Sequence, residues 1–428
     1  MSRSIISCLI LVALSLPPSA ASPCSAGETP LQEYLNTGRL EEGISDFERR
    51  SQAAKDDAEL QFGLGVMQFL QAVEGLAQDQ YRYGVLNRAR NIPFMRIPVP
   101  PNPHPEQISY PKARAIFQNF VSGLEVAEAT LSQVDVDHVK LPVDIGETRL
   151  DLNADGKVGE SEAFWKIYAT FNRNVNENTS KNFVIAFDGG DVLWLRGYCH
   201  LLMAMGEFVL AHDWNDLFQR TAHLFYPDVQ SDFPQLQQEG VGMFMGFRAE
   251  NIADLIAFIH LINFEVADRE KMRSSIEHLI AMTELSPQSW ALITAETDND
   301  REWLPNSEQT GVIPNVAITD EMISGWIEVM KELQAVFQGE RLLPYWRGNP
   351  RVTTPVGPNV NKSYGINLNR VFTEPRRFDL ILWIQGTAAT PYLESYQEVQ
   401  KRPVDAEVFS RMRRLFRGEF IGFAIWFN

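Results

Sequence analysis

Apolar residues recur every three or four positions along much of this chain, which is the spacing of amphipathic helices. The pattern predicts helices in the following stretches: three between 29 and 80, then one each at 113–134, 188–212, 240–264, 268–285 and 319–337. Asp188 and Thr319 stand where a side-chain oxygen can cap a first helical turn, and Gly339 follows the end of the last helix. The chain is therefore predicted to be mainly α, as a multi-helix bundle or a helical-repeat-like body.

Two stretches of the chain lack this helical periodicity. The range 93–111 contains seven prolines, which predicts an extended connector, and the apolar residues beside them indicate that it lies against the protein. Prolines, glycines and asparagines dominate 343–369, and the apolar run 377–384 has the length of a strand. A short helix at 405–417 and a buried apolar end are expected after it. We therefore expect a small irregular or β C-terminal region.

These patterns divide the chain into six segments. They are a signal peptide (1–21), an N-terminal helical region (22–92), a Pro-rich connector (93–111), a helix followed by an acidic loop (112–182), a helical body (183–342) and a loop-rich C-terminal region (343–428). Residues 57–70 weakly resemble a tetratricopeptide helix in their density of small and apolar side chains. The 34-residue period of such repeats does not recur, so no repeat array is predicted.

Residues 1–21 have the three parts of a secretory signal peptide. Arg3 gives a positive start, 5–16 is an apolar run, and the small residues at 19–21 suit cleavage. The run is too short for a membrane span, which needs about 20 apolar residues. We expect an exported protein, periplasmic or secreted, with no membrane span after the signal is removed.

Export also bears on the two cysteines that would remain, Cys24 and Cys199. An oxidising compartment permits a disulfide between them. Cys199 lies in an apolar helical stretch, however, where a buried free thiol is common. Both states are open from the sequence.

The charge of the chain limits its partners. The 428 residues carry a formal net charge of −17, which is unfavourable for binding nucleic acids or anionic membranes. The same charge suits a protein that binds cations. We therefore expect no nucleic-acid partner.

One stretch of twelve residues, Asp-Leu-Asn-Ala-Asp-Gly-Lys-Val-Gly-Glu-Ser-Glu from Asp151 to Glu162, places oxygen-bearing side chains at alternate positions. The side-chain oxygens of Asp151, Asn153 and Asp155 can converge on one hard cation. A sharp turn at a glycine then brings the carbonyl oxygen of Lys157 to the ion. Glu162 can close the shell with both carboxylate oxygens.

This loop resembles the calcium-binding loop of the EF-hand family at every fixed position, with Gly156 at the turn. The resemblance implies Ca²⁺ as the ion and the five residues just named as its ligands. It is confined to the loop, because 161–171 has the spacing of an outgoing helix whereas Pro142 and Gly146 interrupt any incoming helix. The sequence contains no second loop of this type, and regulatory EF-hands usually come in pairs. The resemblance therefore implies a structural ion, as in single extracellular calcium modules such as dockerins.

The predicted function is that of an exported calcium-ion-binding protein, in which calcium is structural and which acts as a binding or scaffold protein. The usual catalytic signatures are missing from the sequence, including a G-x-S-x-G elbow, H-E-x-x-H and a phosphate-binding glycine-rich loop. An enzyme is therefore the less favoured interpretation.

The alternative is an extracytoplasmic enzyme, such as a hydrolase. Arg196, His200 and Glu207 recur on one face of an apolar helix, and a second such helix carries Asp254 and His260. The two helices could form a polar pocket, or the same groups could be a closed structural network. An open cavity lined by these residues would indicate an enzyme, and closed pairs a scaffold. The histidines without a shared spacing are expected at the surface or as caps: His104, His138, His212, His223 and His278.

Overall fold

The computed structural model places most of the chain in helices that pack around apolar cores. It describes residues 29–86, 95, 97–169, 183–237, 256–311, 318–347, 364–396, 399 and 401–415. The predicted signal peptide, Cys24, most of the helix predicted at 240–264 and the predicted apolar end of the chain lie outside these residues. What the sequence indicates for them stays a prediction.

The first part of the chain forms three helices, as predicted. They are α1 (Pro30–Thr37), α2 (Leu40–Ala53) and α3 (Ala58–Arg82). Asp57 caps α3 by accepting a hydrogen bond from the backbone N–H of Leu60 at 2.9 Å. Gly38 ends α1 in the left-handed conformation, with a φ of 62°. Local signals at the helix ends therefore agree with the fold in this part of the chain.

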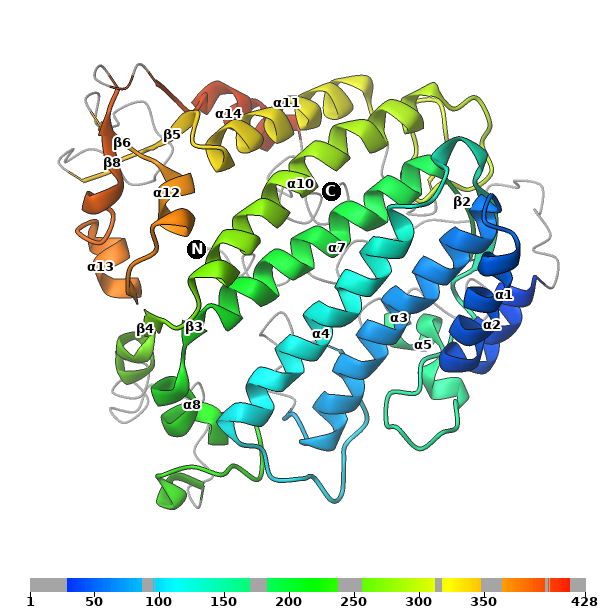
Figure 1. Ribbon diagram of the computed structural model, residues 1–428, viewed down its shortest axis with the longest axis horizontal. Coiled ribbons are helices and arrows are strands. Elements are labelled where there is room, and N and C mark those ends of the chain that lie inside the picture. The colour runs from blue at the N-terminus through cyan, green and yellow to red at the C-terminus, as the bar shows by residue number, and fades with distance from the viewer. Residues whose placement is uncertain are drawn as a thin grey trace.

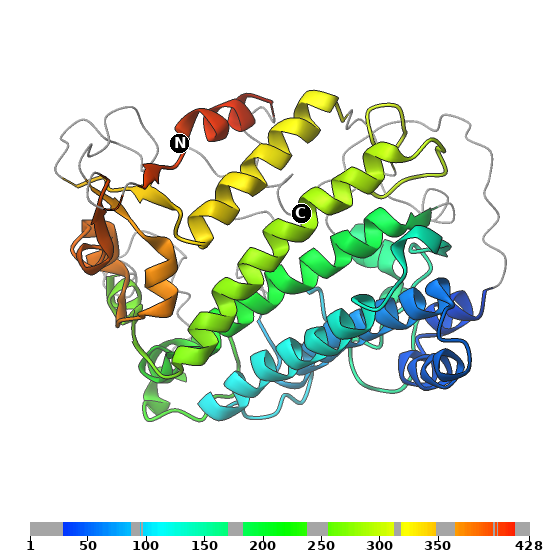
Figure 2. The same ribbon diagram turned by 45° about the horizontal axis from the view of Figure 1, so that its top comes forward.

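Further long helices in the described part of the chain complete the body. They are α4 (Tyr110–Leu131), α7 (Gly189–Leu210), α10 (Arg269–Ala295) and α11 (Asp320–Phe337). In Figure 1, α3, α4, α7, α10 and α11 lie side by side in that order, and neighbours run in opposite directions. Figure 2 shows the same order from a second direction. The prediction of a mainly α fold is confirmed.

The caps predicted for two of these helices are present. Thr319 accepts a hydrogen bond from the backbone N–H of Met322 at 3.2 Å. Asp188 Oδ1 accepts one from the N–H of Gly190 at 2.8 Å. Gly339, just past α11, has a φ of 76°, which the glycine permits. The polar residue at the start thus sets where each of these helices begins, and the glycine marks the end of α11.

The helix α10 is longer than predicted, because it continues through Pro287. Proline removes a helical hydrogen bond and usually ends a helix. Here the face that packs on neighbouring helices extends past it. Ser289 Oγ donates to the carbonyl of Gly190 at 2.8 Å, and Ser286 Oγ accepts from Trp326 Nε1 at 3.0 Å. Tertiary packing on α7 and α11 therefore overrides the local stop signal.

Short strands form small sheets beside the helices. In one, β1 (Lys140–Asp144) runs antiparallel to β2 (Val184–Asp188). The other strands are β3 (His212–Asp213), β4 (Asn263–Val266), β5 (Arg341–Pro344), β6 (Tyr364–Ile366), β7 (Phe378–Asp379), β8 (Leu393–Ser395) and β9 (Arg402–Pro403). They pair in the orders β3-β4-β7 and β8-β6-β5-β9, and only β5 with β9 is parallel. The β1–β2 pair sets the start of α7 beside the segment that leads into the acidic loop.

Short helices connect these elements. They are α5 (Phe164–Ala169), α8 (Asn215–Thr221), α12 (Leu368–Thr373), α13 (Leu380–Gln385), α14 (Ala406–Leu415) and the 3-10 turns Val136–His138, Glu160–Glu162, Ala222–Leu224, Pro234–Gln237 and Thr390–Tyr392. The helix predicted at 405–417 is therefore present as α14, as far as this segment is described.

The strand predicted at 377–384 is wrong, because most of this run is the helix α13. Asp379 caps the helix by accepting a hydrogen bond from the N–H of Leu382 at 2.9 Å, and Gly386 ends it with a φ of 97°. A short apolar run suits a helix or a strand, and here the cap and the glycine decide. Residues 263–264, predicted as the end of a helix, instead belong to β4 and pair with β7.

The Pro-rich connector lies against the body, as predicted. Val99 is buried and Ile97 packs on the main core. Asn102 Nδ2 donates to the carbonyl of Tyr81 near the end of α3 at 2.9 Å. The prolines keep the segment extended while these contacts hold it in place.

The largest apolar core joins segments that are far apart in the sequence. It includes Phe62 of α3, Leu124 of α4 and Leu195 of α7. A second core contains Trp290 of α10 and Trp326 of α11, and a third lies in the C-terminal part. The N-terminal helices, α4 and α7 thus fold around one interior. None of the described helices is long and apolar enough to cross a membrane.

Candidate metal centre

The predicted calcium loop, 151–162, lies between β1 and α5. An antiparallel bridge between Arg149 and Ala163 joins its two ends, and the N–H of Phe164 donates to the carbonyl of Thr148 at 2.8 Å. The chain therefore enters and leaves the loop at one place. The segment before the loop is not helical, as predicted, and the outgoing α-helix begins at Phe164 after a 3-10 turn.

The polar side chains of the loop hold its backbone turn. Asp151 Oδ2 accepts a hydrogen bond from the N–H of Gly156 at 2.9 Å, and Asn153 Oδ1 accepts one from Asp155 at 3.0 Å. Asp155 Oδ1 accepts from the N–H of Lys157 at 2.8 Å. Gly156 has a φ of 74°, the conformation that glycine adopts without a steric penalty. The sharp turn expected at this glycine is therefore present.

Glu162 closes the loop from its last position. Its side chain is buried, with 6% of the residue exposed. Oε1 accepts a hydrogen bond from the N–H of Leu152 at 3.1 Å, and Oε2 accepts one from Gly159 at 2.8 Å. Both carboxylate oxygens thus reach across the loop to its second and ninth positions.

The donor set of the loop fits calcium. All of its predicted ligand atoms are oxygens, which this hard cation prefers. Two basic side chains that flank the loop pair with other acids: Arg149 with Glu147 at 3.8 Å and Lys166 with Glu160 at 3.2 Å. Within the described ranges, no basic side chain forms an ion pair with the three carboxylates predicted as ligands.

The first residue of the loop is held by α3. The N–H of Asp151 donates to Glu74 Oε2 at 2.7 Å, and Gln78 Nε2 donates to the carbonyl of Asp151 at 2.8 Å. At the eighth position, Val158 meets the end of α1, since a Cβ added to Gly38 would lie 2.3 Å from Val158 Cγ1. The loop is therefore docked on two N-terminal helices.

Glu74 is a part of this region that the sequence pattern does not reveal. Burial raises the pKa of its carboxyl to about 7, and the negative charges of Asp151 and Glu162 act in the same direction. Glu74 stands far from the loop in the sequence, on a helix whose periodicity gives no hint of this contact. Only the packing of α3 on the loop brings the two together.

Arg196 and His200 of α7 form a closed network with α4. Arg196 Nε and Nη2 donate to Glu128 Oε1 at 3.0 and 2.9 Å, and His200 Nε2 lies 3.5 Å from the same oxygen. The hydrogen bond from His200, followed by that from Arg196, lowers the pKa of Glu128 to about 2. His200 Nδ1 lies 2.9 Å from Nδ1 of His278 on α10, whose pKa burial lowers to about 4.

The structure corrects several predictions about this face. His278 and His212 were expected at the surface or as caps. His278 is partly buried in this network, and His212 is buried, with 3% of the residue exposed. Glu207 pairs with Lys271 of α10 at 3.0 Å and does not join Arg196 and His200. His260 is exposed, and the polar residues that precede it in the predicted helix lie outside the described ranges. Arg196, His200 and Glu207 are therefore paired, with partners from α4 and α10.

A group of acids that the sequence does not reveal lies where α7 begins. Among the described residues, Asp188, Glu296 and Glu302 bring carboxylate oxygens within 4.8 Å of one another, which the carboxylates of the loop 151–162 do not do. Burial, followed by the charge of Asp188, raises the pKa of Glu296 to about 9. Burial also raises the pKa of Glu302 to about 7 and that of Asp191 well above its usual value. Glu296 therefore holds its proton near neutral pH.

Cys199 is a free thiol with no exposed surface, and burial raises its pKa strongly. This is the buried state that its apolar helix suggested. The thiol is unreactive in such surroundings, because the thiolate form is disfavoured.

Comparisons of the chain with protein-family models, with curated proteins and with solved structures found no match. The loop with its oxygen donors is the feature from which a specific chemistry follows.

Proposed function

We propose that this chain is an exported calcium-ion-binding protein, in which Ca²⁺ has a structural role at an EF-hand-type loop and which acts as a binding or scaffold protein. The observation that carries the proposal is the loop 151–162. Its ligand positions are filled by oxygen donors, and the carboxylates among them pair with no basic side chain in the described ranges. The paired state of Arg196 and His200 favours a scaffold over the enzyme with an open polar pocket.

The proposed ligands are oxygens from five residues of the loop: the side chains of Asp151, Asn153, Asp155 and Glu162 and the backbone carbonyl of Lys157. The bound ion would supply positive charge to three carboxylates that repel one another without it. Because the loop is part of the fold, the free energy of binding stabilises the folded protein.

The contacts of the loop explain why such an ion would be structural. Val158 lies against Gly38 at the end of α1, and Asp151 is held by Glu74 and Gln78 of α3. An ion that fixes the loop therefore also fixes its contacts with two helices. Extracellular modules of this kind bind calcium with dissociation constants on the order of 0.1–1 mM, which suits a permanent clamp.

Unfolding with calcium and with chelator tests the proposal. For a dissociation constant of about 0.3 mM, calcium at about 10 mM should stabilise the mature protein by about 2 kcal/mol. Glu162→Gln should lose this stabilisation, because one ligand oxygen is replaced by an amide nitrogen. Thermal or urea unfolding, monitored by circular dichroism, measures both.

Glu160→Gln is the matched control, since Glu160 lies two positions away, is exposed and pairs with Lys166. This variant should respond to calcium as the wild type does. An unchanged midpoint in the wild type, or an equal rise in Glu162→Gln, would contradict the calcium site.

A further inference from the structure

A pair of histidines lies in the contact between α7 and α10, two helices that pack side by side in Figure 1. Nδ1 of His200 lies 2.9 Å from Nδ1 of His278, and the centroids of the two rings are 5.1 Å apart. The other ring nitrogen of His200, Nε2, lies 3.5 Å from Glu128 Oε1 of α4. The pair therefore links side chains from three helices.

This geometry has room for one proton between the two rings. A hydrogen bond between imidazole nitrogens needs one nitrogen that carries a proton and one that does not. If both imidazoles are charged, each Nδ1 carries a proton, so the hydrogen bond is lost and two positive charges face each other across 2.9 Å. The pair therefore keeps this form only while at least one imidazole is neutral.

The charges around the pair do not offset this repulsion. Glu128 attracts both imidazoles, but Arg196 already donates two hydrogen bonds to its Oε1. Burial, followed by the charge of His200, lowers the pKa of His278 to about 4, although Glu128 acts in the opposite direction. Cys199, next to His200, stays neutral because burial raises its pKa. α11 and α12 also pack on α10, and within the described ranges none of their charged side chains contributes to the shift of His278.

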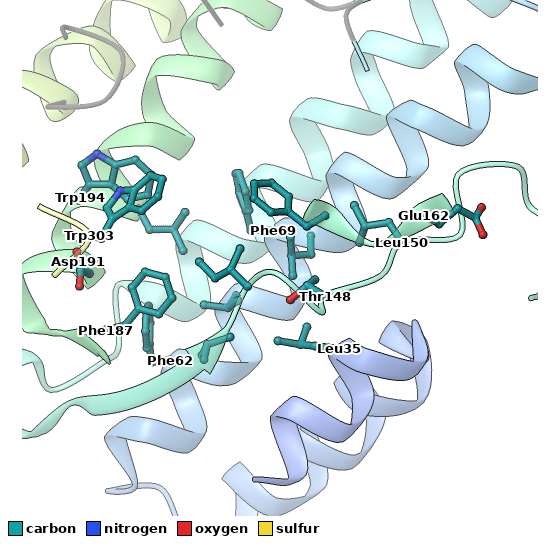
Figure 3. Close-up of a pocket in the computed structure, with 16 residues that line it drawn as sticks. Leu35, Phe62, Phe69, Thr148, Leu150, Glu162, Phe187, Asp191, Trp194 and Trp303 are labelled. Carbon is teal, nitrogen blue, oxygen red and sulfur yellow. The ribbon is translucent and has the colours of Figure 1, made fainter. Parts of the chain in front are cut away.

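The contact between α7 and α10 joins two apolar cores. Leu195 of α7 lies in the main core, and Trp290 of α10 lies in the second. Trp194 of α7 packs on both cores and meets Trp303, from the segment after α10, edge to face at 5.4 Å (Figure 3). A looser contact between the two helices would therefore loosen one core from the other.

Other polar contacts hold α10 on α7 on both sides of the pair. Towards the start of α10, Lys271 pairs with Glu207 at 3.0 Å. Towards its end, Ser289 Oγ donates to the carbonyl of Gly190 at 2.8 Å. Neither contact involves an imidazole, so both can persist when the pair is broken. An opening at the pair therefore begins as a local event in these two helices.

We propose that the contact between α7 and α10 is an acid-sensitive joint. Uptake of a second proton by the His200–His278 pair breaks its hydrogen bond and loosens α10 from α7. The two cores that these helices connect are then held together less firmly than at neutral pH. The proposal is independent of the calcium site, because none of the loop's donor atoms takes part.

Hydrogen exchange of the full mature protein at pH 7 and pH 5 tests the joint. A folded pKa of about 4 for His278, below the usual 6.5, means that its contribution to stability is present above pH 6.5 and is lost as the pH falls towards 4. The equilibrium constant for opening α10 should therefore rise about 20-fold between pH 7 and pH 5. Mass spectrometry measures it, with calcium present throughout and with labelling times scaled for the pH dependence of chemical exchange.

Two variants remove the second site of protonation. His278→Gln and His200→Gln each place an amide, which takes up no proton in this range, beside the remaining imidazole. The rise between pH 7 and pH 5 should be absent from both variants. His138→Gln is the matched control, because His138 is exposed and lies beside Asp135, outside the contact between α7 and α10. This variant should show the rise of the wild type.

The helix α3, which packs on α4, is the internal reference. A wild type whose α7 and α10 exchange no faster at pH 5 overturns the proposal, as does an equal rise in α3, which would show that acid acts on global unfolding alone. An undiminished rise in a folded His278→Gln or His200→Gln overturns the role of the pair. Circular dichroism shows whether each variant is folded. If neither variant folds, the comparison of α10 with α3 in the wild type still decides whether the joint exists.

Discussion

At the scale of single residues, the neighbours of a buried carboxyl decide the direction of its pKa shift. Glu128 and Glu302 are both largely removed from water, yet their pKa values move in opposite directions. Glu128 accepts hydrogen bonds from His200 and Arg196, which favour the charged form. Glu302 has other acids around it, and burial favours its neutral form. The two residues therefore contribute to stability in opposite ranges of pH.

Glu128→Gln should destabilise the protein by about 2 kcal/mol at pH 7, because it removes the charge that two basic groups bind. A folded pKa of about 2, below the usual 4.5, means that this contribution is present above pH 4.5 and is lost as the pH falls towards 2. The difference between variant and wild type should therefore shrink at pH 3. Urea unfolding at both pH values measures it. Glu125→Gln, exposed on the same helix, is the control, and an equal loss in both variants would contradict the network.

Glu302→Gln should have the opposite pH dependence. A folded pKa of about 7, above the usual 4.5, means that the wild type loses stability as the pH rises from 4.5 through 7. Glutamine cannot ionise, so the variant should gain on the order of 2 kcal/mol relative to the wild type between pH 4 and pH 8. Unfolding midpoints in urea across this range measure the gain. The control Glu308→Gln, at an exposed position, should leave the pH dependence of stability unchanged. If the stability of Glu302→Gln instead changed with pH as that of the wild type does, Glu302 would be ionised in the folded protein.

These residues also mark what the sequence can reveal at this scale. The proposed ligands Asp151 to Glu162 stand within twelve consecutive positions, so their spacing is visible in the chain. Glu74, Glu128 and Glu302 meet their partners only through packing between elements distant in sequence. Their polar side chains carry no pattern before that packing is known.

At the scale of elements, the sequence predicts a helix well where the spacing of apolar residues, the N-terminal capping residue and the glycine after the last turn agree. Thr319 and Gly339 bound α11 as expected, because both signals act within one turn of the helix. Prediction is poorer where a local signal competes with tertiary packing. Pro287 is accommodated within α10, and the apolar run 377–384 is short enough for a capped helix to form where a strand was expected. The exceptions therefore lie at elements whose conformation depends on their neighbours.

At the scale of the whole molecule, periodicity gives the helices but not their order in space. The amino-acid sequence predicts amphipathic faces. The order in which α3, α4, α7, α10 and α11 pack side by side depends on which of these faces fit together. The main core includes α1, α3 and the segment around the loop, while the C-terminal strands surround a core of their own. An ion at the loop should therefore act on one part of the molecule more than on the other.

Hydrogen exchange should show this uneven effect of calcium. Val158 packs on the end of α1 and Asp151 on α3, so calcium should slow exchange in these two helices and in the loop. Exchange in 364–396, which has a separate core, should change little under native conditions. Mass spectrometry of the protein with calcium and with chelator measures exchange in both regions. In Glu162→Gln, calcium should not slow exchange in either region. Equal slowing along the whole chain would contradict a local clamp, because it would place the effect of the ion on global unfolding alone.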